Sequence, residues 1–209
     1  MGTDTTDKII TTEVIQNINS KPVFFSDKNG DGHYNVLSAL QKSIRGSDVD
    51  ASIHYLARLL VEGDLKSIER RLSVIAYEDI GLANPAIGPR LDAAINAAER
   101  VGMPEAAIPF GEIVCEMALS PKSNTSHDAI LEAIEDIKNG NVGEVPKHLI
   151  NPSTTYLYPH NYEGAYVVQQ YMPNKIKDKK YYHPKKLGYE VNYKKVYDYI
   201  ENIKKKKGS

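Results

Sequence analysis

Apolar residues recur three and four positions apart along most of residues 33–140, and this spacing constrains the fold more than any other feature. Side chains at this spacing form one stripe along an α-helix. The clearest stripes are at 53–60, 91–98, 110–117, 130–137 and, further on, 196–203. No stretch from 33 to 140 shows the period of two that is typical of a half-buried strand. The sequence therefore predicts an all-α fold, built as an antiparallel helical array with short loops.

Capping residues mark the ends of several of these helices. Asp48 and Asp64 each precede an apolar stripe and suit N-caps, while Gly63 and Gly102 suit the positions that follow a helix. Pro109 falls within the helix that carries the 110–117 stripe, and it lacks a backbone N–H. We therefore expect a kink or a late start there. Weaker patterns predict two further helices, at 12–18 and 34–45.

Prolines interrupt the chain repeatedly after residue 140, at Pro146, Pro152, Pro159, Pro173 and Pro184. They leave room for one short helix, around 163–171, before the terminal helix. This region also holds many tyrosines, whereas disordered segments are poor in aromatic residues. We therefore expect an ordered, irregular Pro/Tyr-rich wrap and then a basic C-terminal helix, both packed on the helical core.

The formal net charge of −1 conceals an uneven distribution. Residues 175–207 contain 12 lysines against four acidic residues, a local charge of about +8, so the remainder carries about −9. Lysines interleaved with tyrosines are typical of surfaces that contact phosphates and stack on bases. Lysines on the wet face of a terminal helix also serve solubility alone, and tyrosines at helical spacing also serve packing. Both interpretations stay open at this point.

Motif by motif, the sequence argues against several kinds of chemistry. Residues 27–32 match the first half of an EF-hand loop, but position 12 is Ser38 where a bidentate glutamate is needed. The chain has no Gly-Lys-Ser/Thr phosphate loop, and its six histidines lack metal-ligand spacing. The Glu78-Asp79 pair is better assigned to helix-end and turn architecture than to a nucleotide site. We predict no catalytic, cofactor-binding or metal site.

Compartment and membrane association are also predicted from composition. Cys115 is the single cysteine, which fits a reducing compartment. No apolar run approaches the roughly 20 residues that span a bilayer, and residues 1–6 have no signal-peptide pattern. We therefore expect a soluble cytoplasmic protein without a membrane partner.

Eight short strings, in order along the chain, resemble a known family. They are HY at 33–34, LSALQKSIRGSD at 37–48, YLAR at 55–58, RRL at 70–72, EDIGLANP at 78–85, ALSPKSN at 118–124, QYMP at 170–173 and KYYHP at 180–184. Together they resemble the C-terminal region of the MgsA/RarA family of AAA+ ATPases, the replication-associated recombination protein A family. This family is related to the eukaryotic Werner helicase-interacting protein. The resemblance covers nearly the whole chain, from about residue 28 to 188.

The resemblance implies that the chain is part of a longer protein. Residues 1–26 would be the end of an AAA+ lid region and a linker, and 27–145 the core of a helical oligomerisation domain similar in kind to a clamp-loader collar. Residues 146–209 would be the wrap and the basic terminal helix. Family members usually have a longer connection where this chain has only 149–159, so a contribution of that segment to DNA contact is in doubt.

The same resemblance implies the function and partners. The domain would hold the parent as a homotetramer at stalled replication forks, in DNA replication, recombination and repair. The chain itself would not be an enzyme and would need no cofactor, because ATP and Mg²⁺ would bind the AAA+ module. Its partners would be other copies of itself, DNA through the parent, and single-strand-binding protein, in the cytoplasm at the nucleoid.

A set of polar residues is predicted to contact DNA or a partner: Arg45, Arg70, Arg71, Lys122, Asn124, Lys179, Lys180, Tyr181, Tyr182, Lys185 and Lys186. The five from Arg45 to Asn124 suit the capping or bracing of a helix equally well. The basic, tyrosine-rich set supports an alternative function, a single-stranded nucleic-acid-binding module. A helical enzyme whose site only the fold assembles is a third hypothesis.

Overall fold

The computed structural model describes residues 31–207, and every regular element in this range is helical. The all-α prediction is therefore confirmed. The longer elements are α2 (Asp31–Arg45), α3 (Val49–Glu62), α4 (Leu65–Ile75), the π-helix η1 (Ala76–Ile80), the 3-10 helix η2 (Gly81–Ala83), α5 (Ile87–Val101), α6 (Ala107–Leu119), α7 (Thr125–Lys138) and α8 (Glu190–Lys207). The helix predicted at 12–18 and residues 27–30 of the EF-hand-like string lie outside the described residues.

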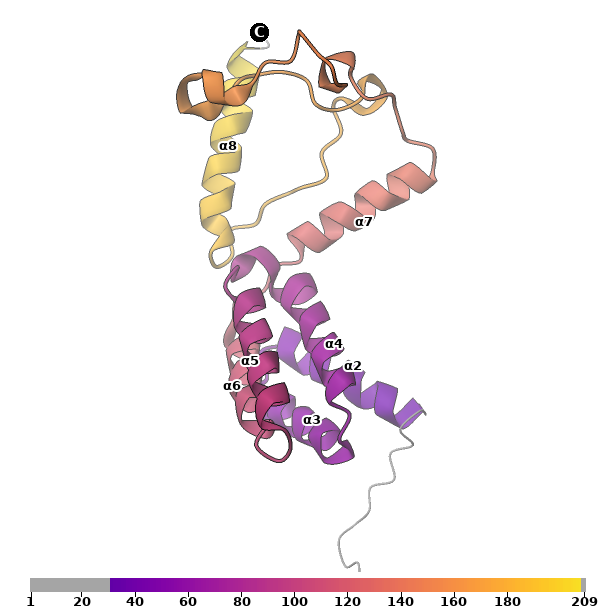
Figure 1. Cartoon of the computed structure of the whole chain (residues 1–209), viewed down its shortest axis with the longest axis vertical. Helices are drawn as coiled ribbons and strands as arrows, with labels where there is room; N and C mark the ends of the chain where they lie inside the picture. The colour runs from indigo at the N-terminus through magenta and orange to yellow at the C-terminus, as the bar shows by residue number, and fades with distance from the viewer. Residues whose placement is uncertain (1–30, 208–209) are drawn as a thin grey trace, which may run out of the picture.

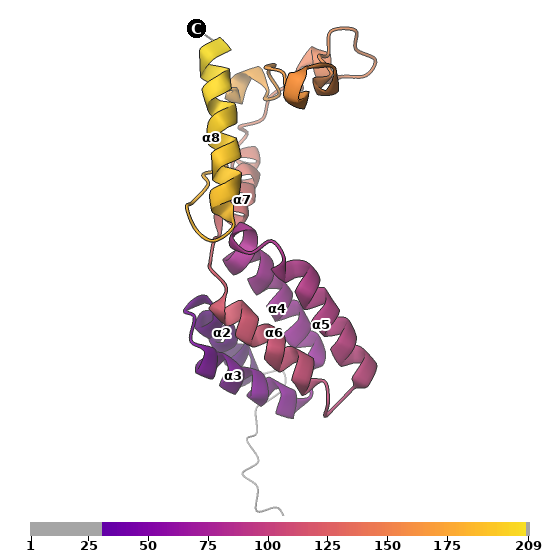
Figure 2. The same ribbon diagram turned by 90° about the vertical axis from the view of Figure 1, so that its left-hand side faces the viewer.

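Helices α2 to α6, with η1 and η2, form a compact unit that we call the core bundle (Figures 1 and 2). Helix α6 is its centre and packs against α2, α3 and α5. Phe110, Val114 and Met117 on α6 are fully buried, as are Leu40 on α2 and Leu59 on α3. Each buried side chain of this size stabilises the fold by roughly 1.5–3 kcal/mol. The predicted stripes at 53–60, 91–98 and 110–117 all contribute to this core.

The predicted helix ends agree with the structure. The side chain of Asp48 accepts a hydrogen bond from the backbone N–H of Ala51 at 2.9 Å, and Asp64 caps α4 in the same way. Gly63 ends α3 in the left-handed conformation, and Gly102 follows α5 with a φ of 71°. Pro109 is the third residue of α6, where the helix needs no backbone N–H, so the late start is observed.

Residues 125–207 form a second unit, which we call the arm (Figure 1). Helix α7 leaves the top of the core bundle, an irregular segment follows, and α8 begins beside the core bundle and runs away from it. The prediction that the wrap and terminal helix pack on the core is wrong. In the arm, only Thr125 and Glu190 are buried, and the start of α8 is the part of that helix that meets the core bundle. The reason is that α2 to α6 already cover one another's apolar faces.

The prediction of a helix around 163–171 is also wrong. Only a 3-10 turn, Glu163–Ala165, forms there, and the chain from 166 to 171 is extended or irregular. Gly164 and Ala165 have φ angles of 68° and 51°, which an α-helix does not allow. Three further 3-10 turns lie at Lys147–Leu149, Pro159–Asn161 and Asn174–Ile176.

Core bundle and arm meet at a small joint made of residues 81–84, 120–125 and 182–190. The backbone N–H of Tyr189 donates to the carbonyl oxygen of Ala83 at 2.7 Å. Gly188 has a φ of 51°, and a Cβ on it would lie 2.3 Å from that same carbonyl oxygen. Gly81, with a φ of 47°, would bring a Cβ to 2.6 Å from the carbonyl oxygen of Ser123. Both positions therefore require glycine, because a side chain would push the two units apart.

Candidate functional site

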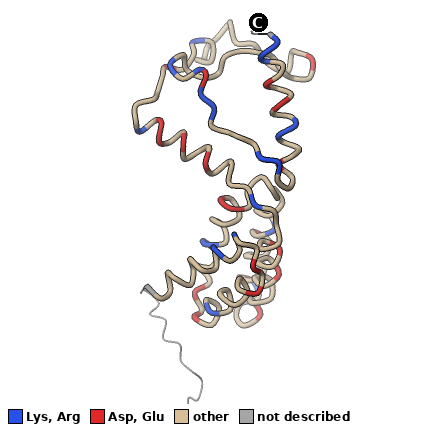
Figure 3. Tube along the Cα trace, turned by 180° about the vertical axis from the view of Figure 1, so that it is seen from behind, with Lys and Arg blue, Asp and Glu red and all other residues tan. Residues whose placement is uncertain are grey.

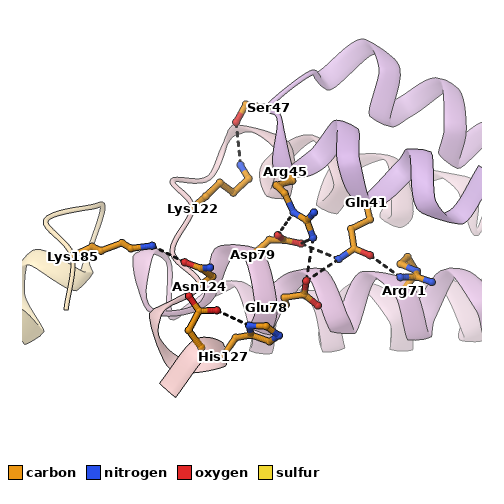
Figure 4. A network of polar contacts seen from close by, with 11 residues as sticks. Gln41, Arg45, Ser47, Arg71, Glu78, Asp79, Lys122, Asn124, His127 and Lys185 are labelled. Carbon is orange, nitrogen blue, oxygen red and sulfur yellow. Dashed lines mark hydrogen bonds and ion pairs between the residues drawn. The ribbon is translucent and has the colours of Figure 1, made fainter. Parts of the chain in front are cut away.

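The most connected polar group in the core bundle surrounds Asp79 (Figure 4). Arg45 at the end of α2 forms an ion pair with Asp79 through Nε, and its Nη2 lies 3.1 Å from Glu78 Oε1. Gln41 Nε2 donates to Asp79 Oδ2 at 3.2 Å, and Arg71 Nη1 donates to Gln41 Oε1 at 2.6 Å. The π-helix η1 makes this possible, because its wider turn lets two consecutive carboxylates both reach α2.

This group is a brace between α2, α4 and η1. The Asp79 side chain is only 6% exposed and that of Arg45 is 48% exposed, so the cation faces water while its partner does not. Hydrogen bonding to Asp79 raises the pKa of Arg45. The assignment of Glu78 and Asp79 to helix-end architecture agrees with this geometry. Arg45 and Arg71 were both predicted to contact DNA or a partner. In the structure, their side chains bind Glu78, Asp79 and Gln41 of the same chain.

A polar cleft of about 470 Å³ opens beside this brace. It is lined by Arg45, Glu78, Asp79, Lys122, Ser123, Asn124, His127 and Lys185. Lys122 Nζ donates to the carbonyl oxygens of Ala118 and Ser120 and to Ser47 Oγ, and burial lowers its pKa. Lys185 Nζ donates to Asn124 Oδ1 at 2.6 Å (Figure 4). The structure thus brings four of the predicted contact residues together, but with two carboxylates that offset their charge.

Arg70 is the predicted residue that stands apart from this cleft. It is exposed on α4 and borders a shallow hollow of about 200 Å³ with Leu37, Ser67, Arg71 and Val74. Its side chain forms no ion pair with another part of the described chain.

The basic segment before α8 is largely engaged within the arm. Lys179 Nζ lies 2.8 Å from Glu132 and 2.9 Å from Asp136 on α7, and these contacts raise its pKa. Lys180 forms an ion pair with Glu201 on α8. The Tyr181 ring lies beneath Lys179 Nζ at 5.4 Å, and burial together with the nearby Asp136 carboxylate raises the pKa of its hydroxyl. Figure 3 shows the acidic residues of α7 beside this basic segment. These lysines therefore tie α7 to α8.

Lys186, the remaining predicted residue, is exposed. It follows Lys185 at the edge of the polar cleft.

A buried carboxylate that the sequence analysis missed holds the joint together. Glu190 is fully buried at the first residue of α8 and accepts hydrogen bonds from Ser123 and Thr125 at 2.5 Å and from Tyr182 at 3.0 Å. Burial raises the pKa of a carboxyl, but these three hydroxyl donors hold the pKa of Glu190 below its ordinary value. Burial and the bond to Glu190 raise the pKa of Tyr182 to about 12.

We call Glu190 and its three donors, Ser123, Thr125 and Tyr182, the lock. One local signal in the sequence indicates it. An acidic residue in the first turn of a helix is typical, and Ser123 and Thr125 flank the start of α7. The sequence could not pair them, because 65 residues separate Thr125 from Glu190. Tyr182, predicted as a possible stacking residue, belongs to the lock.

Exposed apolar side chains are the main feature of the surface of the arm. Most of the large hydrophobic residues that the described chain exposes lie there: Ile130, Leu131, Ile134, Ile137, Val142, Val145, Ile150, Tyr156, Leu157, Tyr158, Tyr162, Tyr171, Leu187, Tyr189, Tyr193, Val196 and Tyr199. Monomeric soluble proteins seldom expose contiguous apolar patches above a few hundred Å². The arm is therefore the strongest candidate for an interaction surface.

A hollow in the described part of the chain adjoins this surface. We call it the elbow groove, a mostly apolar cavity of about 480 Å³ between the start of α7 and the helices η1, η2 and α5. Its apolar wall comprises Val74, Tyr77, Leu82, Pro85, Ile87 and Ile130. Ile130 belongs both to the groove and to the exposed stripe of α7, so the two apolar surfaces are continuous.

The described residues offer neither a metal site nor a membrane-spanning helix. In residues 31–207 no group of three or more His, Cys, Asp and Glu side chains is arranged to hold a metal ion. Within the same range no helix combines the length and the apolarity that crossing a membrane requires.

Comparison with known proteins decides the family. The sequence profile described as the MgsA AAA+ ATPase C terminal matches residues 46–201, which is most of the chain. The chain belongs to this MgsA family. A second profile, described as the AAA C-terminal domain, matches residues 2–45. The two profiles meet at the end of α2, whereas the sequence analysis places its first boundary after residue 26.

Several similar proteins carry names from DNA metabolism. Replication-associated recombination protein A of Bacillus subtilis is 54% identical over 200 residues, which cover 90% of this chain and 48% of that protein. The protein of the same name in Escherichia coli K12 is 32% identical over 90% of this chain and 44% of its own length. The ATPase WRNIP1 of Dictyostelium discoideum is 32% identical over 84% of this chain and 22% of its own length. The chain thus spans about half the length of its bacterial MgsA relatives.

Proposed function

We propose that this MgsA-family chain is a homo-oligomerisation domain that assembles an AAA+ ATPase as a tetramer, in DNA replication, recombination and repair at stalled forks. The observation that carries the proposal is the contrast between exposure and burial in the arm. Its two long helices bury Thr125 and Glu190 at their first residues but leave their apolar stripes in water.

Helix energetics support this proposal. Isolated helices of up to about 15 residues are marginal in water, and tertiary packing supplies most of their stability in proteins. Helix α7 has 14 residues, and the described chain contacts it at its start, against η1 and η2, and on its acidic face, through Lys179. Other copies of the same chain would supply the missing apolar contacts, since symmetric homo-oligomers are the commonest assemblies.

The names of the relatives support the cellular part of the proposal. Replication-associated recombination proteins are AAA+ family members in which the matched region is about half of the chain. ATP and Mg²⁺ binding, and the role at DNA forks, would then belong to the longer assembly. The described residues would contribute the arrangement of the ATPase modules and no chemistry of their own.

The test is the mass of the chain in solution. Multi-angle light scattering across a dilution series, from tens of micromolar downward, is expected to approach four times the mass of the 23.3-kDa chain. The apparent mass should fall on dilution, as a reversible assembly requires. A mass of one chain at every concentration would contradict the proposal.

Single-stranded nucleic-acid binding has less support from the geometry. Lys179 and Lys180 are held by carboxylates of α7 and α8, and Tyr182 is turned to Glu190. A titration with a labelled single strand at low salt tests it, because phosphate contacts give affinity that falls steeply with salt. Salt-dependent binding would restore this alternative.

A further inference from the structure

The polar cleft lies where the core bundle and the arm meet, and both units supply its walls. Arg45 faces it from the end of α2, whereas Lys185 belongs to the segment that leads into α8. Lys185 reaches Asn124, beside the start of α7, through a hydrogen bond of 2.6 Å (Figure 4). The cleft volume of about 470 Å³ falls within the range of small-molecule sites. A ligand in the cleft would therefore contact both units at once.

The cleft has a surplus of positive charge. Its lining includes three cations, Arg45, Lys122 and Lys185. Two carboxylates, Glu78 and Asp79, line it as well, which leaves a formal charge of +1. Arg45 forms ion pairs with both carboxylates. Lys122 and Lys185 form no ion pair within the described residues, because their ammonium groups bind only carbonyl, hydroxyl and amide oxygens. The surplus therefore comes from the two lysines.

Unused hydrogen-bond donors remain on three of the lining residues. An ammonium group has three N–H donors, and Lys185 Nζ uses one of them. The amide nitrogen of Asn124 and Nη1 of Arg45 donate to no acceptor among residues 31–207. A phosphoryl group offers three strong acceptor oxygens together with negative charge, whereas a carboxylate has two oxygens. The free donors and the surplus charge thus suit a phosphoryl group.

The environment of Lys122 favours an anion in the same place. Its Nζ donates to two carbonyl oxygens and to Ser47 Oγ, all of them neutral, and burial lowers its pKa. A negative charge nearby favours the charged form of an amine. An anion in the cleft would therefore offset the cost of burying this ammonium group.

From this geometry we infer that the polar cleft binds a phosphoryl group, which accepts hydrogen bonds from Arg45, Asn124 and Lys185 and thereby fixes the arm to the core bundle. Ser123 lines the cleft and also donates to Glu190, so the site adjoins the lock. The inference concerns a ligand site within one chain and does not depend on the proposed oligomerisation.

Titration with inorganic phosphate at constant ionic strength tests the site. Two-dimensional NMR of the whole chain is expected to show saturable shifts of the backbone amides of 122–127 and 183–187. Lys185→Ala should weaken phosphate binding about tenfold, because a hydrogen bond from a charged group is lost. Lys185→Arg, which keeps the charge, should retain most of the affinity.

Lys186→Ala is the matched control. It removes the same charge from the next residue, which is exposed and does not line the cleft, and it should leave the affinity for phosphate unchanged. If Lys185→Ala and Lys186→Ala weaken binding equally, the lysines act only through net charge and the inference is overturned. The absence of saturable shifts in the unchanged chain would overturn it as well.

Two probes distinguish the sources of the phosphoryl group. Equal affinities for inorganic phosphate and for deoxyadenosine monophosphate would mean that the phosphoryl group alone is recognised. Tighter binding of the nucleotide would mean that its sugar and base occupy the remainder of the 470 Å³ cleft. Both results support the site, and saturable binding of neither probe contradicts it.

The order of the arm provides a second readout. Phosphate is expected to slow the exchange of backbone amide hydrogens with solvent at the starts of α7 and α8, and Lys185→Ala should remove this effect. That variant also controls for the general stabilisation of folded proteins by phosphate salts. Light scattering on the same samples should show a constant mass, which separates the effect from association. Phosphate binding that leaves this exchange unchanged would overturn the link between ligand and arm.

Discussion

The core bundle and the arm are built from similar amphipathic helices but treat their apolar faces in opposite ways. All of the buried hydrophobic residues of the described chain lie between Val36 and Ala118, in the core bundle. The arm holds most of the exposed ones and buries two polar residues, Thr125 and Glu190. A stripe of apolar residues therefore predicts a helix in both units, but it indicates a core in one and an interaction surface in the other.

The largest expected difference between the units concerns apolar truncation. Phe110→Ala removes a fully buried ring at the centre of the core bundle and should lower the free energy of unfolding by about 3–5 kcal/mol. Tyr199→Ala removes an exposed ring from the arm and should change it by less than about 0.5 kcal/mol. Urea unfolding, followed by circular dichroism below the concentration of association, measures both. Equal losses would show that the arm has a folded core of its own.

Association should show the reverse order. Ile134→Ser on α7 is expected to weaken assembly, since it removes an apolar contact that only a partner copy provides. Val61→Ser on α3, an 89% exposed position of the core bundle, is the matched control. Light scattering on dilution measures the association of both variants. If Val61→Ser weakens association as strongly as Ile134→Ser, the arm is not the specific association surface.

The joint is expected to be the next most sensitive place. Glu190→Gln replaces the buried charge that three hydroxyls bind and should cost about 2 kcal/mol, a value typical of hydrogen bonds to a charged group. Exchange of backbone amide hydrogens with solvent should become faster in α8, while the amides of α6 should exchange as slowly as in the unchanged chain. Glu163→Gln, at an exposed position, is the control. Faster exchange throughout α6 would mean that arm and core bundle unfold together.

Low pH should weaken the same lock, because it protonates the Glu190 carboxylate. The folded-state pKa of Glu190 is below its unfolded value of about 4.3, so its contribution to stability is complete above that unfolded value. The contribution is lost as the pH falls through the lower folded-state pKa. Exchange in α8 should thus rise below about pH 4, and Glu190→Gln should remove that pH dependence.

The brace in the core bundle should give a smaller effect. Arg45→Ala leaves the 6% exposed Asp79 carboxylate without its cation, and we expect a loss of about 1–2 kcal/mol because Gln41 still donates to it. Arg70→Ala on α4 should be close to neutral. Adding Asp79→Asn to Arg45→Ala should recover part of the loss in urea unfolding. No recovery would mean that Arg45 acts through packing alone.

The smallest expected effect is at the exposed bridge between α7 and α8. Lys179→Ala removes its contacts with Glu132 and Asp136 and should leave global unfolding unchanged. Exchange should rise only in the last two turns of α7, and salt should produce the same change in the unaltered chain. Lys186→Ala is the control, and a global loss of stability would contradict this view of the arm.

Local patterns in the sequence predicted the elements well where the relevant interactions are local. Asp48, Asp64 and Gly63 mark helix ends through hydrogen bonds that span only a few residues, and Pro109 marks the start of α6 for the same reason. The predicted helix at 163–171 failed because Gly164 and Ala165 adopt left-handed backbone conformations that periodicity does not reveal.

The candidate site was predicted only in part. Arg45, Lys122, Asn124 and Lys185 were singled out by type, and the structure brings them to one polar cleft. Of these four, Arg45 forms ion pairs with Glu78 and Asp79, and the sequence did not predict them because those carboxylates lie 33 and 34 residues further along the chain. Glu190 was missed because two of its three donors, Ser123 and Thr125, precede it by 67 and 65 residues.

The sequence by itself determined the helical class, most helix ends and the membership of the MgsA family, since each depends on neighbouring residues or on strings that stay in order. Only the tertiary structure decided which apolar stripes are buried. A stripe such as Ile130, Ile134 and Ile137 has the same spacing as the stripes of α3 and α6. Whether it is buried depends on where Gly188, Tyr189 and Glu190 hold the arm against the core bundle. Within the described residues, those long-range contacts direct most of α7 and α8 away from the core bundle, which would otherwise cover their apolar faces.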